Sequence, residues 1–321
     1  MREQTARALR AQGMDPAEVQ RIVQTALLED LGPRWLDVTS ASTIPAEQVD
    51  TADIVARASG VVAGLHVAAS VFEEVEVTRS VQLDAQRART GLDRNDDSAA
   101  ESSAARTTVE LISRDGARVA RGDLLATVTG PTRVLLMAER TALNLLSRMS
   151  GVATHTRAWA DELEGTKATV LDTRKTTPGL RILEKYAVRA GGGTNKRMGL
   201  YDVAMIKDNH KLAAGSVTAA YERVRETFPE VAVQVEVTTL AEAVEATEAG
   251  ADFLLLDNMT PELLREIVAE VGGRVELEAT GGLTLEVARE YAETGVDYLS
   301  VGGLTHSSPI VDIALDLRPR G

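Results

Sequence analysis

The chain of 321 residues contains no cysteine and few aromatic residues. The absence of cysteine excludes disulfides, thiolate zinc sites, iron–sulfur clusters and a cysteine nucleophile. Because aromatic residues make up only 3% of the chain, the core must consist mainly of Ala, Val, Leu and Ile. An aliphatic core of this kind favours helices packed on a parallel sheet over an aromatic-rich β-sandwich.

The chain also lacks long apolar runs and an excess of positive charge. No stretch approaches the ~18 apolar residues typical of a membrane span, and the charged first residues, MREQTARALRAQ, contain no apolar signal-peptide region. The net charge of −13 argues against nucleic-acid partners, whose binding depends on neutralising phosphates. We therefore expect a cytoplasmic protein with neither nucleic-acid nor membrane partners.

The first half of the chain mixes helical and strand-like patterns. Residues 15–30 predict a helix, and residues 51–65 and 114–136 predict strands with glycine turns. The stretch 87–108 is poor in apolar residues, which predicts a mobile insertion or a long hairpin loop. Residues 131–151 predict a long helix with an apolar stripe that joins two domains.

From residue 167 onwards, short apolar strands alternate with helical patterns. The predicted strands are 169–174, 203–208, 231–237, 253–258, 275–280 and 298–303, and the last four recur about every 22 residues. This repeat is typical of a parallel (β/α) barrel or a doubly wound sheet. We favour a barrel, because each strand ends in polar or glycine residues, as barrel active sites require.

Positive charge is concentrated in one window of this acidic chain. Residues 172–211 contain nine cations and four anions, a net charge of +5. A solvated surface is the ordinary explanation of such a window. Here the cations lie among glycines and strand-like segments, which favours a pocket for a small ligand with several negative charges.

The predicted strand ends supply the candidate site residues. In a barrel they converge on one rim, where two carboxylates, five cations and two glycine pairs would meet: Glu236 and Asp257; Arg174, Lys175, Lys196, Arg197 and Lys207; Gly281–Gly282 and Gly302–Gly303. The glycine pairs match the usual phosphate site of barrels, although turns also need glycine. The four histidines show no spacing typical of metal ligands, so we expect structural roles for them.

The two carboxylates leave two interpretations open. Glu236 and Asp257 can bind ribose hydroxyls, ligate Mg²⁺ or stabilise a positively charged transition state. Alternatively, they form structural ion pairs with Arg174, Lys175 or Lys207, although five cations exceed what two carboxylates require.

At these residues the sequence resembles the quinolinate phosphoribosyltransferases, and the resemblance extends over nearly the whole chain. The matching blocks are LLEDLGPRWLDVT (27–39), VVAGL (61–65), AERTALNLLSRMSGVAT (138–154), DTRKTTPGLRILEKYAVRAGGGTNKRMGLYD (172–202), IKDNH (206–210), EVTTL (236–240), LLLDN (254–258) and TGVDYLSVGGLTHS (294–307). So many blocks in the same order are more specific than any single motif.

The resemblance implies an α/β fold of the type II phosphoribosyltransferase kind. It comprises an N-terminal α/β open-faced sandwich, residues 1–134, and an incomplete parallel (β/α) barrel, residues 135–304, with the tail 305–321 packing back on the sandwich. Family members transfer phosphoribose from 5-phosphoribosyl-1-pyrophosphate to quinolinate with Mg²⁺. They release pyrophosphate and CO₂ and form nicotinate mononucleotide for NAD synthesis. The resemblance also implies a homodimer, or a hexamer built from dimers.

The resemblance further implies a role for each candidate residue. The quinolinate-binding set is Thr173, Arg174, Lys196, Arg197, Lys207 and, entering from a neighbouring subunit, Arg140. The set that binds phosphoribosyl pyrophosphate is Lys175, Glu236, Asp257, Thr280, Gly281, Gly302 and Gly303. Within these sets Lys175, Glu236 and Asp257 are the implied catalytic residues, and Glu236 and Asp257 the implied Mg²⁺ ligands.

Two departures from the family pattern keep alternatives open. The family's Asn-His-Arg reads Asn195-Lys196-Arg197 here, which makes the charge permanent and removes a group that shuttles protons near neutral pH. The family's Glu-Ser-Ser-Gly-Gly reads Glu278-Ala279-Thr280-Gly281-Gly282, with one hydroxyl retained. The alternatives are a relative with another acceptor, such as nicotinate or a molybdenum-transport-associated relative, and a non-catalytic ligand-sensing dimer.

Overall fold

The chain folds into two compact units in the computed structural model, which describes residues 1–90 and 106–320. Unit 1 consists of Met1–Thr154, Ile182–Gly191 and Ser308–Gly321, and unit 2 of His155–Arg181 and Gly192–Ser307. Among the described helices, none is long and apolar enough to cross a membrane.

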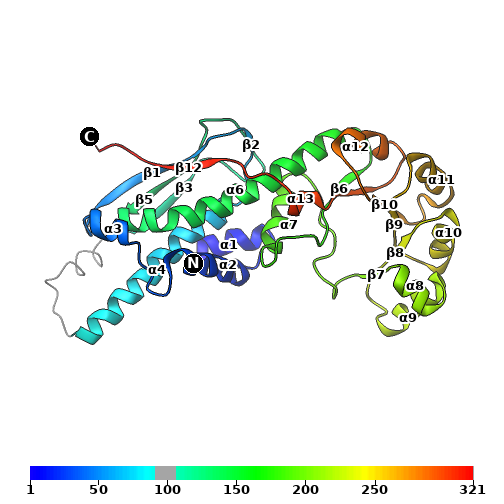
Figure 1. The fold of residues 1–321 in the computed structure, drawn as a ribbon, viewed down its shortest axis with the longest axis horizontal. Helices are drawn as coiled ribbons and strands as arrows, with labels where there is room; N and C mark the ends of the chain where they lie inside the picture. Colours follow the sequence, from blue (N-terminus) through cyan, green and yellow to red (C-terminus); the bar gives the residue numbers. More distant parts are fainter. Residues whose placement is uncertain (91–105, 321) are drawn as a thin grey trace. The chain divides into compact units, whose positions relative to one another are not determined.

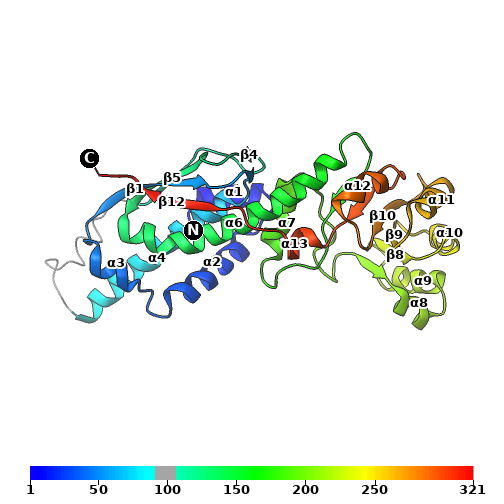
Figure 2. The ribbon, with the colours of Figure 1, turned by 45° about the horizontal axis from the view of Figure 1, so that its top comes forward.

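Unit 1 is a four-stranded antiparallel sheet with helices on one face (Figures 1 and 2). The sheet has the order β12-β1-β5-β3, and β2 and β4 form a separate ribbon. The elements of unit 1, including two helices that continue into unit 2, are α1 (Glu3–Ala11), α2 (Pro16–Leu31), α3 (Val38–Thr43), β1 (Val49–Ala56), β2 (Gly60–Val61), α4 (Leu65–Thr90), β3 (Thr108–Leu111), β4 (Arg118–Val119), β5 (Leu124–Pro131), α6 (Thr132–Glu162), α7 (Arg181–Ala190) and β12 (Ile313–Leu317).

Local sequence explains how these elements begin and which face they bury. Helix α2 starts at Pro16, and the carboxylate of the preceding Asp15 accepts a hydrogen bond from the Ala17 amide. On β1, Ala52, Ile54 and Ala56 are buried, so alternate residues of the strand face the core. The predicted helix at 15–30 is therefore confirmed, as are the strands within 51–65 and 114–136.

The end of the chain returns to unit 1. Strand β12 pairs antiparallel with β1, and Arg318 and Arg320 in the tail bond to Asp53 and Asp50 at 2.9 Å. The open-faced sandwich implied by the resemblance is thus completed by the last residues of the chain.

Unit 2 is built on a six-stranded parallel sheet with the order β6-β11-β10-β9-β8-β7. Its elements are β6 (Thr169–Leu171), β7 (Ala204–Ile206), α8 (Asp208–Ala214), α9 (Val217–Thr227), β8 (Val233–Val237), α10 (Leu240–Ala249), β9 (Phe253–Asp257), α11 (Pro261–Val271), β10 (Glu276–Thr280), α12 (Leu285–Ala292), β11 (Tyr298–Ser300) and α13 (Gly303–His306). All six predicted strands are confirmed, and helices separate β7, β8, β9, β10 and β11 along the chain. In Figure 1, α10 and α11 lie outside the strands β8 and β9.

The register of this sheet brings the carboxyl ends of the strands together. Glu236 on β8 stands opposite Leu255 on β9, and Asp257 on β9 stands opposite Thr280 on β10. Within the described residues, β6 and β7 are the two outer strands and do not pair, so the barrel is incomplete. The α/β class and the incomplete barrel expected from the sequence are both observed.

The two units divide at a different place from the expected boundary after residue 134. Helix α6 is continuous from Thr132 to Glu162, and its residues up to Thr154 belong to unit 1. The hydroxyls of Ser150 and Thr154 on this helix accept hydrogen bonds from the backbone amides of Ala63 and Val61. These contacts hold α6 against unit 1 as far as Thr154.

Both ends of the expected insertion at 87–108 belong to regular elements. Residues 87–90 form the end of α4, because Arg87, Ala88 and Arg89 favour helix, and β3 begins at Thr108. The expectation of a loop was therefore wrong at residues 87–90. Residues 91–105 lie outside the described part of the chain.

Candidate functional site

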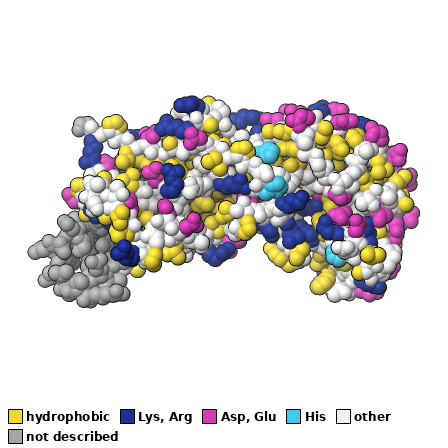
Figure 3. Space-filling model, in the orientation of Figure 1, with side chains coloured by type: hydrophobic (Ala, Val, Ile, Leu, Met, Phe, Trp, Pro, Cys, Tyr) yellow, Lys and Arg dark blue, Asp and Glu magenta, His cyan; other side chains and the backbone are white. Residues whose placement is uncertain are grey.

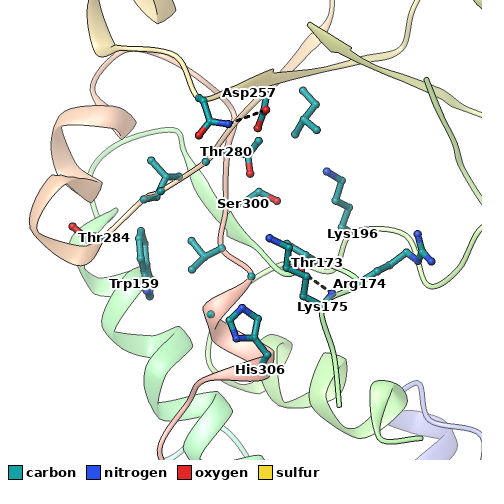
Figure 4. Close-up of a pocket in the computed structure, with 18 of the residues that line it drawn as sticks. Trp159, Thr173, Arg174, Lys175, Lys196, Asp257, Thr280, Thr284, Ser300 and His306 are labelled. Atoms are coloured by element: carbon teal, nitrogen blue, oxygen red, sulfur yellow. Dashed lines mark hydrogen bonds between the residues drawn. The ribbon is translucent and has the colours of Figure 1, made fainter. Parts of the chain in front are cut away.

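A cavity of 980 Å³ opens in unit 2 at the carboxyl ends of the parallel strands (Figure 4). Twelve of the thirteen candidate residues line it: Thr173, Arg174, Lys175, Lys196, Arg197, Lys207, Glu236, Asp257, Thr280, Gly281, Gly302 and Gly303. The thirteenth, Arg140, belongs to unit 1 and lies on α6, with its side chain 63% exposed. The predicted convergence of the strand ends is therefore observed.

Charge is arranged unevenly around the cavity. Five Lys and Arg side chains line it, against three carboxylates from Glu236, Asp257 and Glu286. In Figure 4, Thr173, Arg174, Lys175 and Lys196 lie on one side, Trp159 and Thr284 on the opposite side, Asp257 and Thr280 at one end and His306 at the other. On the face drawn in Figure 3, several Lys and Arg side chains form one patch, and others are scattered over the same face, as Asp and Glu are.

Four of the nine cations in the 172–211 window have other positions. Arg181 donates to the Met198 carbonyl at 2.9 Å, and Lys211 bonds to Glu242 at 2.8 Å. Lys185 and Arg189 belong to unit 1, where Lys185 is fully buried. The excess of positive charge in the sequence therefore divides between structural contacts and the cavity.

A buried aspartate positions Lys196 and Arg197. Asp172 follows β6 and is fully buried, and its carboxylate accepts hydrogen bonds from Nδ2 of Asn195 at 2.6 Å and from the Lys196 amide at 2.8 Å. Thr194 also forms a parallel bridge with Leu171. These contacts keep the segment after Gly193 beside β6, so its two cationic side chains reach the cavity.

The positive charges of Arg174 and Arg197 repel each other at the cavity. Burial lowers the pKa of Arg197 below its usual range, and the nearby Arg174 guanidinium lowers it further. The Nε of Arg174 is buried and has no hydrogen-bond partner within the described residues. A bound anion would supply the missing acceptor and reduce the repulsion between the guanidinium groups.

Lys207 and Glu236 form an ion pair at the rim, with Nζ 2.6 Å from Oε2. The pairing of Glu236 with Lys207, one of the two interpretations left open by the sequence, is thus present in the structure. The Lys207 side chain is half-exposed, so this contact is accessible to ligands and to water. Nδ1 of His210 accepts a hydrogen bond from the Lys207 amide at 2.9 Å, which caps α8 and explains the histidine structurally.

Lys196 also has a carboxylate partner, but a buried one. Its Nζ lies 2.5 Å from Oε1 of Glu278, which is fully buried. Burial lowers the pKa of Lys196, while the Glu278 carboxylate opposes that shift. Lys196 therefore belongs to a buried ion pair, and it is not the simple permanent charge expected from the sequence.

Asp257 and Gly281 meet at the end of the cavity formed by β9 and β10. Asn258 has a positive φ of 53°, and its Nδ2 donates to Asp257 at 2.9 Å. Gly281 has a φ of 99°, and a Cβ at this position would collide with the Asn258 side chain. Only glycine therefore fits here.

The loop after β6 is tied to the end of β11. The Lys175 amide donates to Oγ1 of Thr173 at 3.0 Å, and Oγ1 of Thr305 donates to the Lys175 carbonyl at 2.8 Å. A Cβ on Gly302 would lie 3.0 Å from Cδ of Lys175. The small residue at 302 therefore leaves space for the Lys175 side chain.

Sequence analysis missed several lining residues. His155 and Trp159 line the cavity and bond to each other, with Nε1 of Trp159 3.3 Å from Nε2 of His155. His306 and Ser300 line it too, and the buried Oγ of Ser300 has no partner in the described part of the chain. The four-residue spacing of His155 and Trp159, which predicts one helix face, was a usable signal.

The donor set for a metal ion is small. No cluster of three or more His, Asp or Glu residues suited to a metal occurs in residues 1–90 and 106–320. Glu236 and Asp257 nevertheless line the same cavity from adjacent strands. One or two carboxylates with substrate phosphates and water are a usual set for Mg²⁺, so these residues fit an ion that binds together with a phosphorylated ligand.

Comparison with known proteins identifies relatives over almost the full length. The chain is 46% identical over 299 residues to the nicotinate-nucleotide pyrophosphorylase (carboxylating) of Mycobacterium leprae, covering 92% of this chain and 95% of that protein. A probable enzyme of the same name from Bacillus subtilis is 39% identical over 305 residues and 95% of each chain. The solved nicotinate-nucleotide pyrophosphorylase of Francisella tularensis superposes with a TM-score of 0.81 at 31% identity, covering 94% of this chain and 96% of that one.

Family models match both parts of the chain. The model of the quinolinate phosphoribosyl transferase N-terminal domain matches residues 37–92 and 97–150, and the model of its C-terminal domain matches residues 152–316. With the parallel-sheet cavity and these matches together, the chain belongs to the quinolinate phosphoribosyl transferase family.

Proposed function

We propose that this enzyme transfers phosphoribose from 5-phosphoribosyl-1-pyrophosphate to quinolinate and releases pyrophosphate and CO₂. The product is nicotinate mononucleotide, a precursor of NAD. The observation that supports this proposal most is the single cavity in which five cations, two carboxylates from adjacent strands and two glycine turns meet. The names of the relatives point to the same reaction.

The acceptor binds at the side of the cavity that holds the arginines. Quinolinate has two carboxylates, and each guanidinium of Arg174 and Arg197 offers a planar fork of donors for one of them. Lys207 and Thr173 line the same cavity. Binding a dianion between these groups relieves the repulsion that lowers the pKa of Arg197, and it holds the ring nitrogen toward the ribose.

The phosphoribosyl donor binds toward the glycine turns. The backbone at Thr280, Gly281, Gly302 and Gly303 can approach phosphate oxygens closely, because no Cβ is present at the three glycines. Lys175 lies between this wall and Thr173, so its ammonium can contact both substrates. His306 lies beside Gly302, at the end of the cavity opposite Thr280 in Figure 4.

Glu236 and Asp257 act at the ribose. The ring nitrogen of quinolinate forms a bond to C1 of the ribose while the bond from C1 to the pyrophosphate oxygen breaks. Positive charge develops on the ribose, and the two carboxylates stabilise it electrostatically. Glu236 and Asp257 would also hold Mg²⁺, which would supply charge neutralisation for the leaving pyrophosphate.

Decarboxylation follows from the new bond. The ring nitrogen is positively charged once it carries the ribose, so it stabilises the electron pair left on the neighbouring carbon when CO₂ departs. That carbon then takes up a proton, and nicotinate mononucleotide results. The arginine side of the cavity holds the remaining carboxylate in place throughout.

A homodimer, alone or within a hexamer, would complete this site with Arg140 of a second subunit. The side chain of Arg140 is largely exposed, and its Nη2 lies 3.9 Å from its neighbour Glu139, too far for a strong ion pair. It is therefore free to bind a carboxylate presented by a second copy of the chain.

The deciding experiment measures pyrophosphate release from phosphoribosyl pyrophosphate and Mg²⁺ with quinolinate and, in parallel, with nicotinate. We expect release with quinolinate, matched by an equal amount of CO₂, and none without an acceptor. Release with nicotinate alone would favour the other-acceptor alternative, for which Lys196 is the specific sequence observation. Binding of both substrates without release would favour a ligand-sensing protein.

A further inference from the structure

Glu278 lies beneath the acceptor side of the cavity and is satisfied from two directions. Its Oε1 lies 2.5 Å from Nζ of Lys196, and its Oε2 accepts a hydrogen bond from Nε2 of Gln234 at 2.6 Å. Glu278 and Gln234 are both buried, and neither lines the cavity. The carboxylate thus contacts the site only through Lys196.

A second cavity helps to locate the Lys196–Glu278 pair in the barrel. It measures 400 Å³ and lies at the amino ends of the strands, where Val233, Phe253, Glu276 and Tyr298 line it. Lys196 and Arg197 line both cavities. They therefore form part of the floor between the substrate cavity and the interior of the barrel.

Burial and two neighbouring cations disfavour an ammonium on Lys196 at this floor. Burial lowers the pKa of Lys196, and the positive charges of Arg197 and Lys207 lower it further. Glu278 is the carboxylate that opposes these effects. Because a buried carboxylate is costly without a partner, Lys196 and Glu278 depend on each other.

We infer that Glu278 is a positioning residue for acceptor binding: it holds the Lys196 ammonium on the cavity floor, and the pair acts on the acceptor as one unit. The inference rests on the proposed function, because it takes the acceptor to be a pyridine dicarboxylate bound beside Arg174 and Arg197. In this view the lysine that replaces the family's usual histidine is accommodated by a partner already buried behind it.

The test is a double-mutant cycle with Lys196→Met, Glu278→Gln and the double variant. We measure KM for quinolinate, KM for phosphoribosyl pyrophosphate, kcat and, without the donor, quinolinate affinity by calorimetry. Each single variant should weaken quinolinate binding about tenfold or more, as loss of a charged hydrogen bond does, with the donor KM nearly unchanged. The double variant should bind quinolinate at least as tightly as the single variant with the lower affinity.

Glu276→Gln is the matched control. Glu276 lies on the same strand two residues earlier and is exposed outside the substrate cavity, so this variant should bind quinolinate as the unchanged protein does. Unchanged quinolinate affinity in Glu278→Gln would overturn the inference, as would a double variant whose loss equals the product of the single losses.

Folding does not prevent the test. If Glu278→Gln alone were unstable, the double variant would still fold, because it contains neither buried charge. In that case Lys196→Met and the double variant should bind quinolinate equally, and a further loss in the double variant would contradict the inference. Failure of the proposed function is distinguishable, because the unchanged protein would then release no pyrophosphate with quinolinate. The calorimetric titrations of the same variants would still test the Lys196–Glu278 pair.

Discussion

The cavity contains two Lys–Glu pairs with nearly equal contact distances and very different surroundings. Lys207 lies 2.6 Å from Glu236, and their side chains are 49% and 12% exposed. Lys196 lies 2.5 Å from Glu278, with exposures of 13% and 0%. Water screens the first pair and is nearly excluded from the second.

The difference in burial separates their tasks. An exposed pair contributes little to stability, so either member can leave its partner for a substrate at small cost. A buried pair cannot separate cheaply, because each charge would then lack both water and a counter-ion. We therefore expect Glu236 to take part in the reaction and Glu278 to keep its partner in place throughout.

Among the substitutions at these two pairs, we expect Glu236→Gln to lower kcat most. Removing one preorganised electrostatic group from an active site costs roughly 10²–10³-fold in kcat. We expect a loss of about that size, with the melting temperature nearly unchanged, since the Lys207 side chain that loses its partner is half-exposed to water. Steady-state kinetics and thermal unfolding check both points. Near-normal kcat would show that Glu236 serves only as the counter-ion of Lys207.

Lys196→Met and Lys207→Met should differ in their effect on the free energy of unfolding. The first leaves Glu278 buried without its ammonium and should lower the free energy of unfolding by about 3 kcal/mol. The second should lower it by less than about 1 kcal/mol, since Glu236 keeps access to water. Urea denaturation of both variants measures the difference. Equal losses would mean that burial does not distinguish the two pairs.

We also expect a modest dependence of the KM for quinolinate on pH. Burial lowers the pKa of Lys196, an effect that Arg197 and Lys207 increase and Glu278 opposes. As pH rises, Lys196 should lose its proton earlier than an ordinary lysine, and quinolinate binding should weaken. Between about pH 8 and about pH 10 we expect the KM for quinolinate to rise severalfold.

Lys196→Arg tests the origin of that rise, because a guanidinium stays protonated over this range. The variant should show a flatter KM profile than the unchanged protein, whereas Lys207→Arg should retain the rise. A profile that Lys196→Arg leaves unaltered would assign the pH dependence to another group.

Much of the fold could be predicted from the sequence because its signals are local. Six apolar strands with helices between most of them marked the parallel sheet, and strand ends such as Glu236 and Asp257 marked one rim. Asp15 before Pro16 marked the start of a helix, which the structure confirms. Each of these features depends on spacing or on immediate neighbours.

Features that depend on distant partners could not be predicted in the same way. Nothing in the spacing of Lys196 and Glu278 indicates that they touch, since 82 residues separate them. The end of unit 1 at Thr154 depends on hydroxyls of α6 that meet a backbone segment about 90 residues earlier. Histidines 155 and 306 gave no paired spacing, yet both line the cavity.

The residue types at the ends of the strands, and with them the kind of chemistry that the site can perform, follow from the amino-acid sequence. Which cations face the cavity, and which carboxylate each one meets, depends on how the chain packs. The reason is physical: the strength of a charge depends on burial and on its nearest counter-charge. Both are set when segments distant in the chain pack together, as Lys196 packs against Glu278.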